Sequence, residues 1–334
     1  MPRQGSALGA IPPAPAIGCS GQLRWLDLFA DFDEGQGVTA VAIRSWWAIN
    51  GFLPEPKRKR LMTFRSILVH FDIEARPERR IAFALQLAGR FDAELKCACF
   101  ADPTFALAMG RSAALAVNIM RKDAAAIETR QRDLHEQIME NAPFSTHVEW
   151  CAEITDPTTT IVKRARGADL VVLFRLDKGQ VDDHQRTADQ GVVLLSAARP
   201  VLIPSPTMND LVARTIVVAW KDTGQARRAI TDALPLLRQA EDVVLLTVRE
   251  TDHDNDTAED VVHYLIRHNV RARGLIEPPR LGGSGEAIID IAAKLQADLV
   301  VAGGYGHSRI RERIFGGVTE HLLRHCTQHL FLSN

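Results

Sequence analysis

The stretch DLVVAGGYGHSRIRERIFGGVTEHLL, residues 298–323, decides the fold. Its first five residues form an apolar run typical of a buried strand, which breaks into glycines before a helical pattern resumes at Gly317. A strand that passes through glycines into a helix start presents backbone N–H groups that can bind a phosphate. The stretch therefore predicts a phosphate-binding turn between a strand and a helix.

The strand of this stretch has a copy earlier in the chain. The segment QADLVVA at 296–302 repeats GADLVVL at 167–173, and RTIVVAW at 214–220 repeats RSILVHF at 65–71. In each copy, apolar runs of strand length alternate with amphipathic helical patterns, which implies right-handed crossovers and a parallel sheet. A period of about 140 residues makes the chain a tandem duplication.

The two copies predict the same order of elements. In the first we expect strands at 66–71, 94–100, 147–152, 169–174 and one ending at 203, with helices at 78–91, 106–140, 157–166 and before the last strand. In the second we expect strands at 214–220, 242–248, 270–276, 298–302 and one beginning near His329, with helices at 225–237, 258–268, 286–296 and from Gly317.

The length of 334 residues favours two domains and an extension. We expect the domains at 62–205, the first half, and at 213–334, the second half. Residues 1–61 carry PPAP at 12–15 and KRKR at 57–60 without sustained periodicity, and read as an irregular extension that is disordered or not native, since Met62 directly precedes the first strand. A tethering arm is the alternative interpretation.

The composition is that of an ordinary globular protein. Hydrophobic residues make up 46% and charged residues 24%, and a net charge of -1 gives no reason to expect nucleic acid or an anionic membrane as a partner. The five cysteines form no CxxC pair, and Cys97 and Cys99, two apart in one strand, are expected to be reduced core residues. A reducing cytoplasm fits this cysteine usage best.

The glycine spacing carries a resemblance. Gly303 and Gly306 are followed, after nine intervening residues, by Gly316 and Gly317, and this spacing resembles the nucleotide-binding signature of the universal stress protein family. The resemblance implies, for each half, a doubly wound α/β domain of adenine-nucleotide-binding, Rossmann-like type, with a five-stranded parallel sheet and helices on both faces. It also implies that the halves pack as an intramolecular pseudo-dimer. By this resemblance the chain is a cytoplasmic stress-response protein whose second half binds ATP or AMP, with Mg only alongside ATP.

The resemblance assigns nucleotide-binding residues to the second half. The glycines and the helix start would bind phosphate through backbone N–H groups, and Val248 would wall the base. Two positions depart from the family pattern, because Gly317 replaces a hydroxyl residue and Lys221 replaces a carboxylate. The full candidate set is Gly303, Gly306, His307, Ser308, Gly316, Gly317, Val318, Thr319, Lys221, Asp222 and Val248.

The first half departs from the family pattern at the opposite positions. It keeps Asp72 after its first strand, but has Phe174 or Arg175, and Asp177, where the second half has Gly303 and Gly306, and Ala188 and Asp189 in place of Gly316 and Gly317. A carboxylate at a phosphate-facing helix start repels the ligand. We therefore expect no triphosphate site there, and a role as scaffold or as a site for another ligand.

Several alternatives stay open. The chain could be a tandem module without nucleotide that acts as a protein-interaction scaffold, and its protein partner and any homodimer of tandem chains are undetermined. Slow ATP hydrolysis would use His307 or Asp222 to orient water, although no catalytic motif is present and none is assigned. A solvated helix face is favoured over a zinc site for His321, His325, Cys326 and His329. The segment GGSG at 282–285 is expected to be a mobile loop with Ser284 near a helix N-cap, or a lid.

Overall fold

The computed structural model describes residues 63–103, 113–176, 183–249, 258–278, 281–305 and 317–334. All of them belong to one compact unit, Leu61–Asn334. The predicted extension at 1–61 lies outside the described residues, so the interpretation of that segment stays a prediction.

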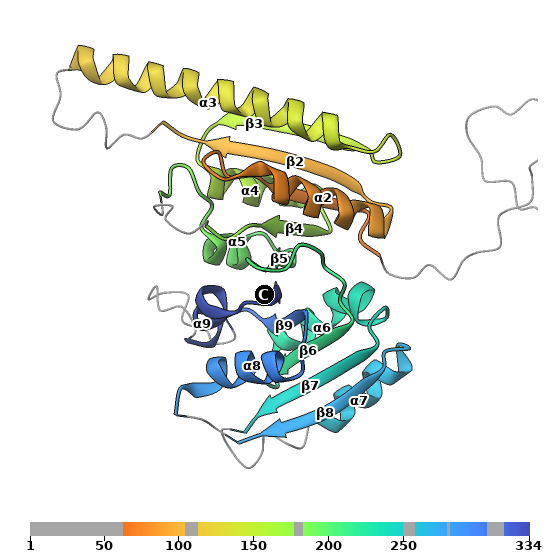
Figure 1. Ribbon diagram of the computed structural model, residues 1–334. Coiled ribbons are helices and arrows are strands. Elements are labelled where there is room, and N and C mark those ends of the chain that lie inside the picture. The colour runs from red at the N-terminus through yellow and green to blue at the C-terminus, as the bar shows by residue number, and fades with distance from the viewer. Residues whose placement is uncertain (1–62, 104–112, 177–182, 250–257, 279–280, 306–316) are drawn as a thin grey trace, which may run out of the picture. The chain divides into compact units, whose positions relative to one another are not determined.

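Each half has the predicted alternation of strands and helices (Figure 1). The elements of the first half are β1 (Ser66–His70), α2 (Pro77–Phe91), β2 (Glu94–Ala101), α3 (Ala113–Asn141), β3 (Val148–Ile154), α4 (Pro157–Arg164), β4 (Leu170–Leu173), α5 (Gln190–Ser196) and β5 (Val201–Ile203). Those of the second half are β6 (Thr215–Trp220), α6 (Gly224–Leu237), β7 (Asp242–Val248), α7 (Ala258–Arg267), β8 (Ala272–Glu277), α8 (Gly283–Lys294), β9 (Leu299–Gly303), α9 (Gly317–His325) and β10 (His329–Ser333).

The strands form one ten-stranded sheet in the order β3-β2-β1-β4-β5-β10-β9-β6-β7-β8. All neighbours within a half are parallel, which confirms the five-stranded parallel sheets. The halves join through the antiparallel pair β5–β10, in which Leu330 lies opposite Ile203. The pseudo-dimer is thus a continuous sheet across both halves rather than two sheets in side-chain contact.

Helices cover both faces of this sheet. On one face α2, α3, α6 and α7 bury side chains such as Phe83, Ile127 and Leu234 against the strands. On the other face α4, α5, α8 and α9 contribute Leu194, Leu322 and their neighbours. Burial of such side chains, each about 1.5–3 kcal/mol, is the main stabilising term of the fold.

Local residue chemistry accounts for the helix starts. Asp156 accepts a hydrogen bond from the Thr159 backbone N–H at 2.8 Å and Pro157 occupies the first position of α4. In the second half, Thr223 caps α6 in the same way by accepting from the Ala226 N–H at 3.2 Å. Both helices therefore begin directly after a strand end and point their first turns at the sheet edge.

Two expectations about smaller segments are settled. Cys97 and Cys99 are buried on the same face of β2 as free thiols, as predicted. The expected loop at 282–285 is wrong, because α8 begins at Gly283, three residues before the predicted start. The reason is packing: a Cβ at Gly285 would lie 3.0 Å from the His321 side chain, so glycines let this first turn approach α9. None of the described helices is long and apolar enough to cross a membrane.

Candidate functional site

A groove runs past the carboxyl ends of β6, β7 and β9 and continues to residues of the first half. This edge of a parallel sheet is where doubly wound proteins bind ligands. The second half contributes strand ends, the starts of α6 and α9 and part of α8, through residues that include Trp220, Lys221, Thr223, Ala226, Val248, Ser284, Gly303, Tyr305, Gly317, Val318 and Thr319.

Gly303 lets helix α6 approach the end of β9. A Cβ at this position would lie 2.6 Å from the Ala226 backbone nitrogen, which no side chain could tolerate without a backbone shift. The absence of a side chain therefore brings the first turn of α6 to the strand end. The first N–H groups of a helix carry its positive dipole end, so this contact places an anion-attracting element in the groove.

The turn after Gly303 is fixed by α9. Tyr305 adopts the left-handed region, with φ of 51°, and its N–H donates to the Thr319 hydroxyl at 3.1 Å. Burial raises the pKa of the Tyr305 phenol, and the nearby carboxylates of Asp189 and Glu320 raise it further. Thr319 is only 4% exposed, so its hydroxyl holds the turn.

Among the described residues, none packs closely against the first residue of α9. Gly317 is the first residue of this helix, and a Cβ there would meet no atom within 4 Å. Val318 beside it is 38% exposed. The N–H groups of a first helical turn have no intrahelical acceptor, so this end can donate to an anion that enters the groove.

The remaining candidates divide into two groups. Lys221 and half-buried Val248 line the groove, whereas Asp222 pairs with Arg227, whose Nε lies 3.0 Å from its carboxylate, and is not among the lining residues. Gly306, His307, Ser308 and Gly316 lie outside the described residues. Sequence reasoning missed the roles of Thr223 and Tyr305; a threonine directly before a helical pattern was the available signal for the first.

Strand register defines the equivalent positions in the first half. Ile67 lies opposite Leu170 as Ile216 lies opposite Leu299, and 167–173 repeats 296–302. Counting along the strands from these pairs, Asp72 corresponds to Lys221 and Phe174 to Gly303.

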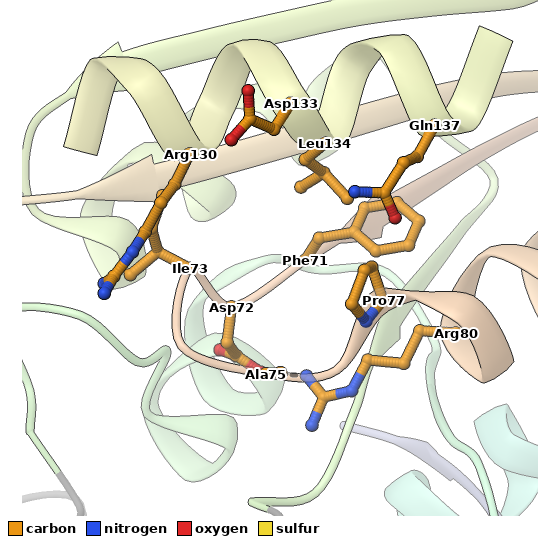
Figure 2. Close-up of a pocket in the computed structure, with 10 residues that line it drawn as sticks. All are labelled: Phe71, Asp72, Ile73, Ala75, Pro77, Arg80, Arg130, Asp133, Leu134 and Gln137. Atoms are coloured by element: carbon orange, nitrogen blue, oxygen red, sulfur yellow. Dashed lines mark hydrogen bonds and ion pairs between the residues drawn. The ribbon is translucent and has the colours of Figure 1, made fainter. Parts of the chain in front are cut away.

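These positions are filled in the first half. Arg80 is 5% exposed, and its Nη1 donates to the Asp72 carboxylate at 2.6 Å. The Arg80 guanidinium lies over the Phe174 ring, 5.1 Å from the centroid. Figure 2 shows Asp72 and Arg80 at one side of a cavity of about 210 Å³ that is walled by Phe71, Pro77 and Leu134. The ion pair and the ring together occupy the end of the strand, where the second half has Gly303 and the start of α6.

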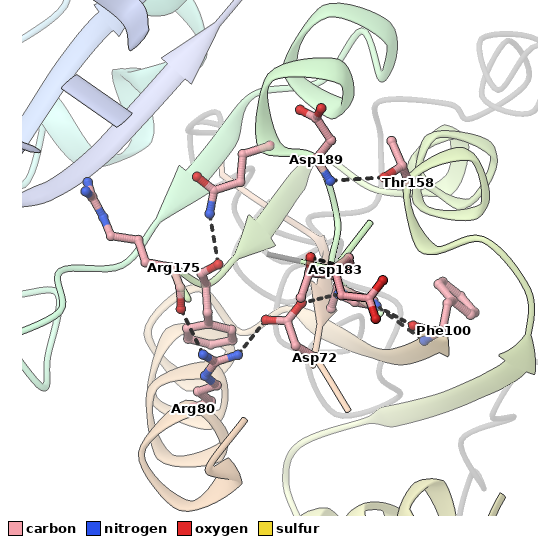
Figure 3. A network of polar contacts seen from close by, with 11 residues as sticks. Asp72, Arg80, Phe100, Thr158, Arg175, Asp183 and Asp189 are labelled. Atoms are coloured by element: carbon pink, nitrogen blue, oxygen red, sulfur yellow. Dashed lines mark hydrogen bonds and ion pairs between the residues drawn. The ribbon is translucent and has the colours of Figure 1, made fainter. Parts of the chain in front are cut away.

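The helix start of the first half also has an internal anion. Asp189 caps α5 by accepting from the Val192 N–H at 3.0 Å, and its own N–H donates to the Thr158 hydroxyl, also at 3.0 Å (Figure 3). The negative charge of the Asp189 carboxylate is therefore already in place where a phosphate would have to bind. The expectation that the first half holds no triphosphate site has this physical basis.

The histidines proposed as an alternative zinc set are not assembled as one. The rings of His321 and His325 lie 4.7 Å apart on α9, but His329 stacks on Phe83 at 5.5 Å, among side chains of the other sheet face. Within the described ranges, no three His, Cys, Asp or Glu side chains are grouped to hold a metal.

A family model matches part of the second half. Residues 279–332 match the model of the Universal stress protein family. No curated protein matches the chain. A universal stress protein from Archaeoglobus fulgidus DSM 4304 superposes with a TM-score of 0.59 at 14% identity, over 80% of this chain and 96% of its own.

Two further solved structures are similar. A functionally unknown protein from Pseudomonas aeruginosa PAO1 has a TM-score of 0.50 at 17% identity, over 81% of this chain and 92% of its own. A universal stress protein in complex with cAMP aligns over 42% of this chain and 97% of its own, at 17% identity and a TM-score of 0.26. The structures with TM-scores of 0.59 and 0.50 establish the fold. Residues 279–332 thus match the universal stress protein family, and the chain has the fold of the solved universal stress protein that covers 80% of it.

Proposed function

We propose that the second half binds an adenine nucleotide, ATP or AMP, and that its occupancy changes contacts with a protein partner in a stress response. The observation that carries the proposal is the exchange at an equivalent strand position, where Phe174 of the first half becomes Gly303. This exchange removes an aromatic ring from the end of the strand. What remains is space beside two helix starts.

The phosphates would bind between the starts of α6 and α9. Gly303 brings α6 to the strand end, Gly317 leaves the start of α9 uncovered, and both line one groove. Two helix dipoles and the Lys221 side chain favour an anion there. Mg would accompany ATP and not AMP, because it would neutralise the additional phosphate charge of ATP.

The base would lie against apolar side chains at the ends of β6 and β7. Ala219, Leu246 and Val248 line this part of the groove, with Ile288 of α8 behind them. Apolar walls with few polar groups suit a planar base. Since Lys221 offers no acceptor to the ribose hydroxyls, affinity would rest on the phosphates and the base.

A scaffold without nucleotide is the second candidate, and one observation favours it. Gly303 and Gly304 each have a packing role, because a Cβ at Gly304 would lie 2.7 Å from Leu194 of the first half, and Thr319 is engaged by Tyr305. These residues would be needed for the fold alone. Gly317 has no such role in the described structure, and it therefore separates the two candidates.

Titration calorimetry with ATP and AMP tests the proposal. Gly317→Leu places a bulky side chain at the start of α9 and should abolish binding by the folded protein. Gly89→Leu is the matched control, since a Cβ at exposed Gly89 on α2 likewise meets nothing within 4 Å and lies away from the groove. Absence of binding by the unaltered protein, with both nucleotides, would favour the scaffold.

A further inference from the structure

A single side chain connects the edge of the first half to helix α9 of the second. Arg175 follows β4, and its Nη1 donates to the backbone carbonyl of Leu323 at 2.7 Å. Leu323 lies in the last turn of α9, where carbonyl groups have no acceptor role left within the helix. The first half thus caps a helix of the second half.

The contact is unusual for an arginine, because the residue is half-buried. In the part of the chain that the structure describes, Arg175 forms no ion pair, and its Nε and Nη2 are buried without a hydrogen-bond partner. Burial lowers the pKa of this guanidinium, with the nearby Cys326 thiol acting in the opposite direction. Burying part of a guanidinium that has so few hydrogen-bond acceptors costs free energy. A contribution to overall stability therefore does not explain why an arginine stands at position 175. The hydrogen bond that its side chain donates goes to a helix C-terminus, where a cation interacts most favourably with the helix dipole.

The backbone of Arg175 is held from within the first half. Arg80 donates from Nη2 to the Arg175 carbonyl at 2.8 Å while its Nη1 binds Asp72. Figure 3 shows the Arg175 side chain extending away from this pair toward the ribbon of the second half. The buried ion pair of the first half therefore fixes the point from which Arg175 reaches α9.

The groove that holds the candidate site runs along α9 from Gly317 to Leu323, and Arg175 lines it as well. Thr319, in the first turn of α9, accepts the Tyr305 N–H, and Gly317 begins the helix at the groove. A second contact between the halves lies at the same turn, where Gly304 packs on Leu194 of α5. Since α9 has nine residues, a displacement at Leu323 is transmitted along a short rigid element to Gly317 and Thr319.

We infer that Arg175 is a positioning residue that fixes α9, so that the first half sets the geometry of the glycine turn and of the nucleotide site in the second half. This inference rests on the proposed function for its consequence on affinity. Its structural part, the restraint on α9, is independent of any ligand.

Two measurements on Arg175→Met, Arg175→Lys and Arg199→Met test it. Methionine keeps the length of the side chain but donates nothing, and lysine keeps one charged donor. Arg199→Met is the matched control, because Arg199 also donates to backbone carbonyls, those of Ala165 and Arg166, but within the first half. The measurements are ATP affinity by calorimetry and amide hydrogen exchange of residues 317–326 without nucleotide.

The expected result is weaker ATP binding by about tenfold in Arg175→Met, since a hydrogen bond from a charged group is lost. Exchange along α9 should rise in the same variant, lysine should restore part of both, and Arg199→Met should match the unaltered protein. Unchanged exchange along α9 in Arg175→Met overturns the inference. If the unaltered protein binds no ATP, the proposed function fails, and exchange alone decides whether Arg175 positions α9. Faster exchange with unchanged affinity would overturn the link to the site.

Discussion

Phe174 in the first half and Gly303 in the second hold the same register position at the ends of equivalent strands, but only the first has a side chain. The Phe174 ring packs on Phe71 and Phe83 and lies beneath Arg80. Gly303 has no side chain, and the start of α6 occupies the adjacent space. The two copies of the duplication thus fill the same position differently, one with an aromatic ring and the other with a helix start.

Gly317→Ser should strengthen nucleotide binding. The new side chain meets no atom within 4 Å of its Cβ, so the fold tolerates it, and its hydroxyl can donate to a phosphate. A hydrogen bond to a charged group contributes about 1.5–3 kcal/mol, which corresponds to a gain of about tenfold or more. Calorimetry with ATP measures the gain. Gly317→Ala adds the Cβ without the hydroxyl and should leave affinity near its original value; an equal gain from both variants would rule out the hydroxyl as the cause.

Gly303→Ala should destabilise the protein. Its Cβ would lie 2.6 Å from the Ala226 nitrogen and 2.8 Å from the Gln225 carbonyl carbon, so α6 has to move. Such overpacking costs about 1–3 kcal/mol of the free energy of unfolding, measured by urea denaturation. Gly89→Ala, in the interior of α2, should instead stabilise by about 0.5–1 kcal/mol, because alanine is the better helix former. Equal stability of Gly303→Ala and the unaltered protein would contradict the close approach of α6.

Removal of Arg80 should expose the buried charge of Asp72. Both side chains are almost fully buried and 2.6 Å apart, so Arg80→Met leaves an uncompensated carboxylate and should cost about 3–5 kcal/mol. The double variant Asp72→Asn with Arg80→Met removes both charges and should be more stable than Arg80→Met alone. Urea denaturation of the two singles and the double measures the coupling. Additive effects would show that the pair does not interact.

Stability should fall as the pH is lowered from about 6.5 toward 4, in part because of His329. Its Nδ1 accepts from the Ser205 N–H at 3.0 Å, and its Nε2 lies 3.0 Å from the Asp210 carbonyl, an arrangement for neutral imidazole. Burial lowers the pKa of His329 to about 4, while the Asp210 carbonyl opposes this shift. Above pH 6.5 neither state binds the proton; below it the unfolded state binds the proton first, and stability is lost until the folded pKa is reached.

This loss of stability amounts to about 1.4 kcal/mol for each unit by which the pKa of His329 differs between the unfolded and folded states, or up to about 3 kcal/mol in all. Burial lowers the pKa of His70 as well, so part of the slope belongs to that residue. Comparing unfolding free energies at pH 7 and pH 5 for the unaltered protein and His329→Gln isolates the share of His329. A pH slope that the substitution leaves unchanged would contradict the neutral buried state.

The sequence predicted the positions of the strands better than the strand pairing that connects the two halves. Apolar runs set β7 at its observed bounds, and His329 begins β10 where the last strand was expected, because both signals depend on local composition. The antiparallel pair β5–β10 could not be read from either strand, since three apolar residues at 201–203 carry no information about their partner. The error at α8 had a similar cause: glycines usually mark loops, and only contact with His321 explains a helical turn there.

The candidate site was predictable in part. Glycine spacing identified Gly303 and Gly317, but their different roles depend on Ala226 packing against one and open space beside the other. The sequence likewise indicated Asp72 as a retained ligand-binding carboxylate. In the structure, Arg80 in the first turn of α2 already donates a hydrogen bond to it. Arg175 has no local pattern at all, because its partner lies 148 residues along the chain.

The number of nucleotides bound per chain tests the central claim most directly. The purified protein is freed of bound nucleotide by refolding or dialysis, and labelled ATP is titrated to saturation by equilibrium dialysis. The account predicts a single site per chain, lost in Gly317→Leu and kept in Gly89→Leu. Absence of binding at concentrations up to about millimolar would contradict nucleotide recognition by the second half. A stoichiometry of two would contradict a nucleotide site confined to the second half.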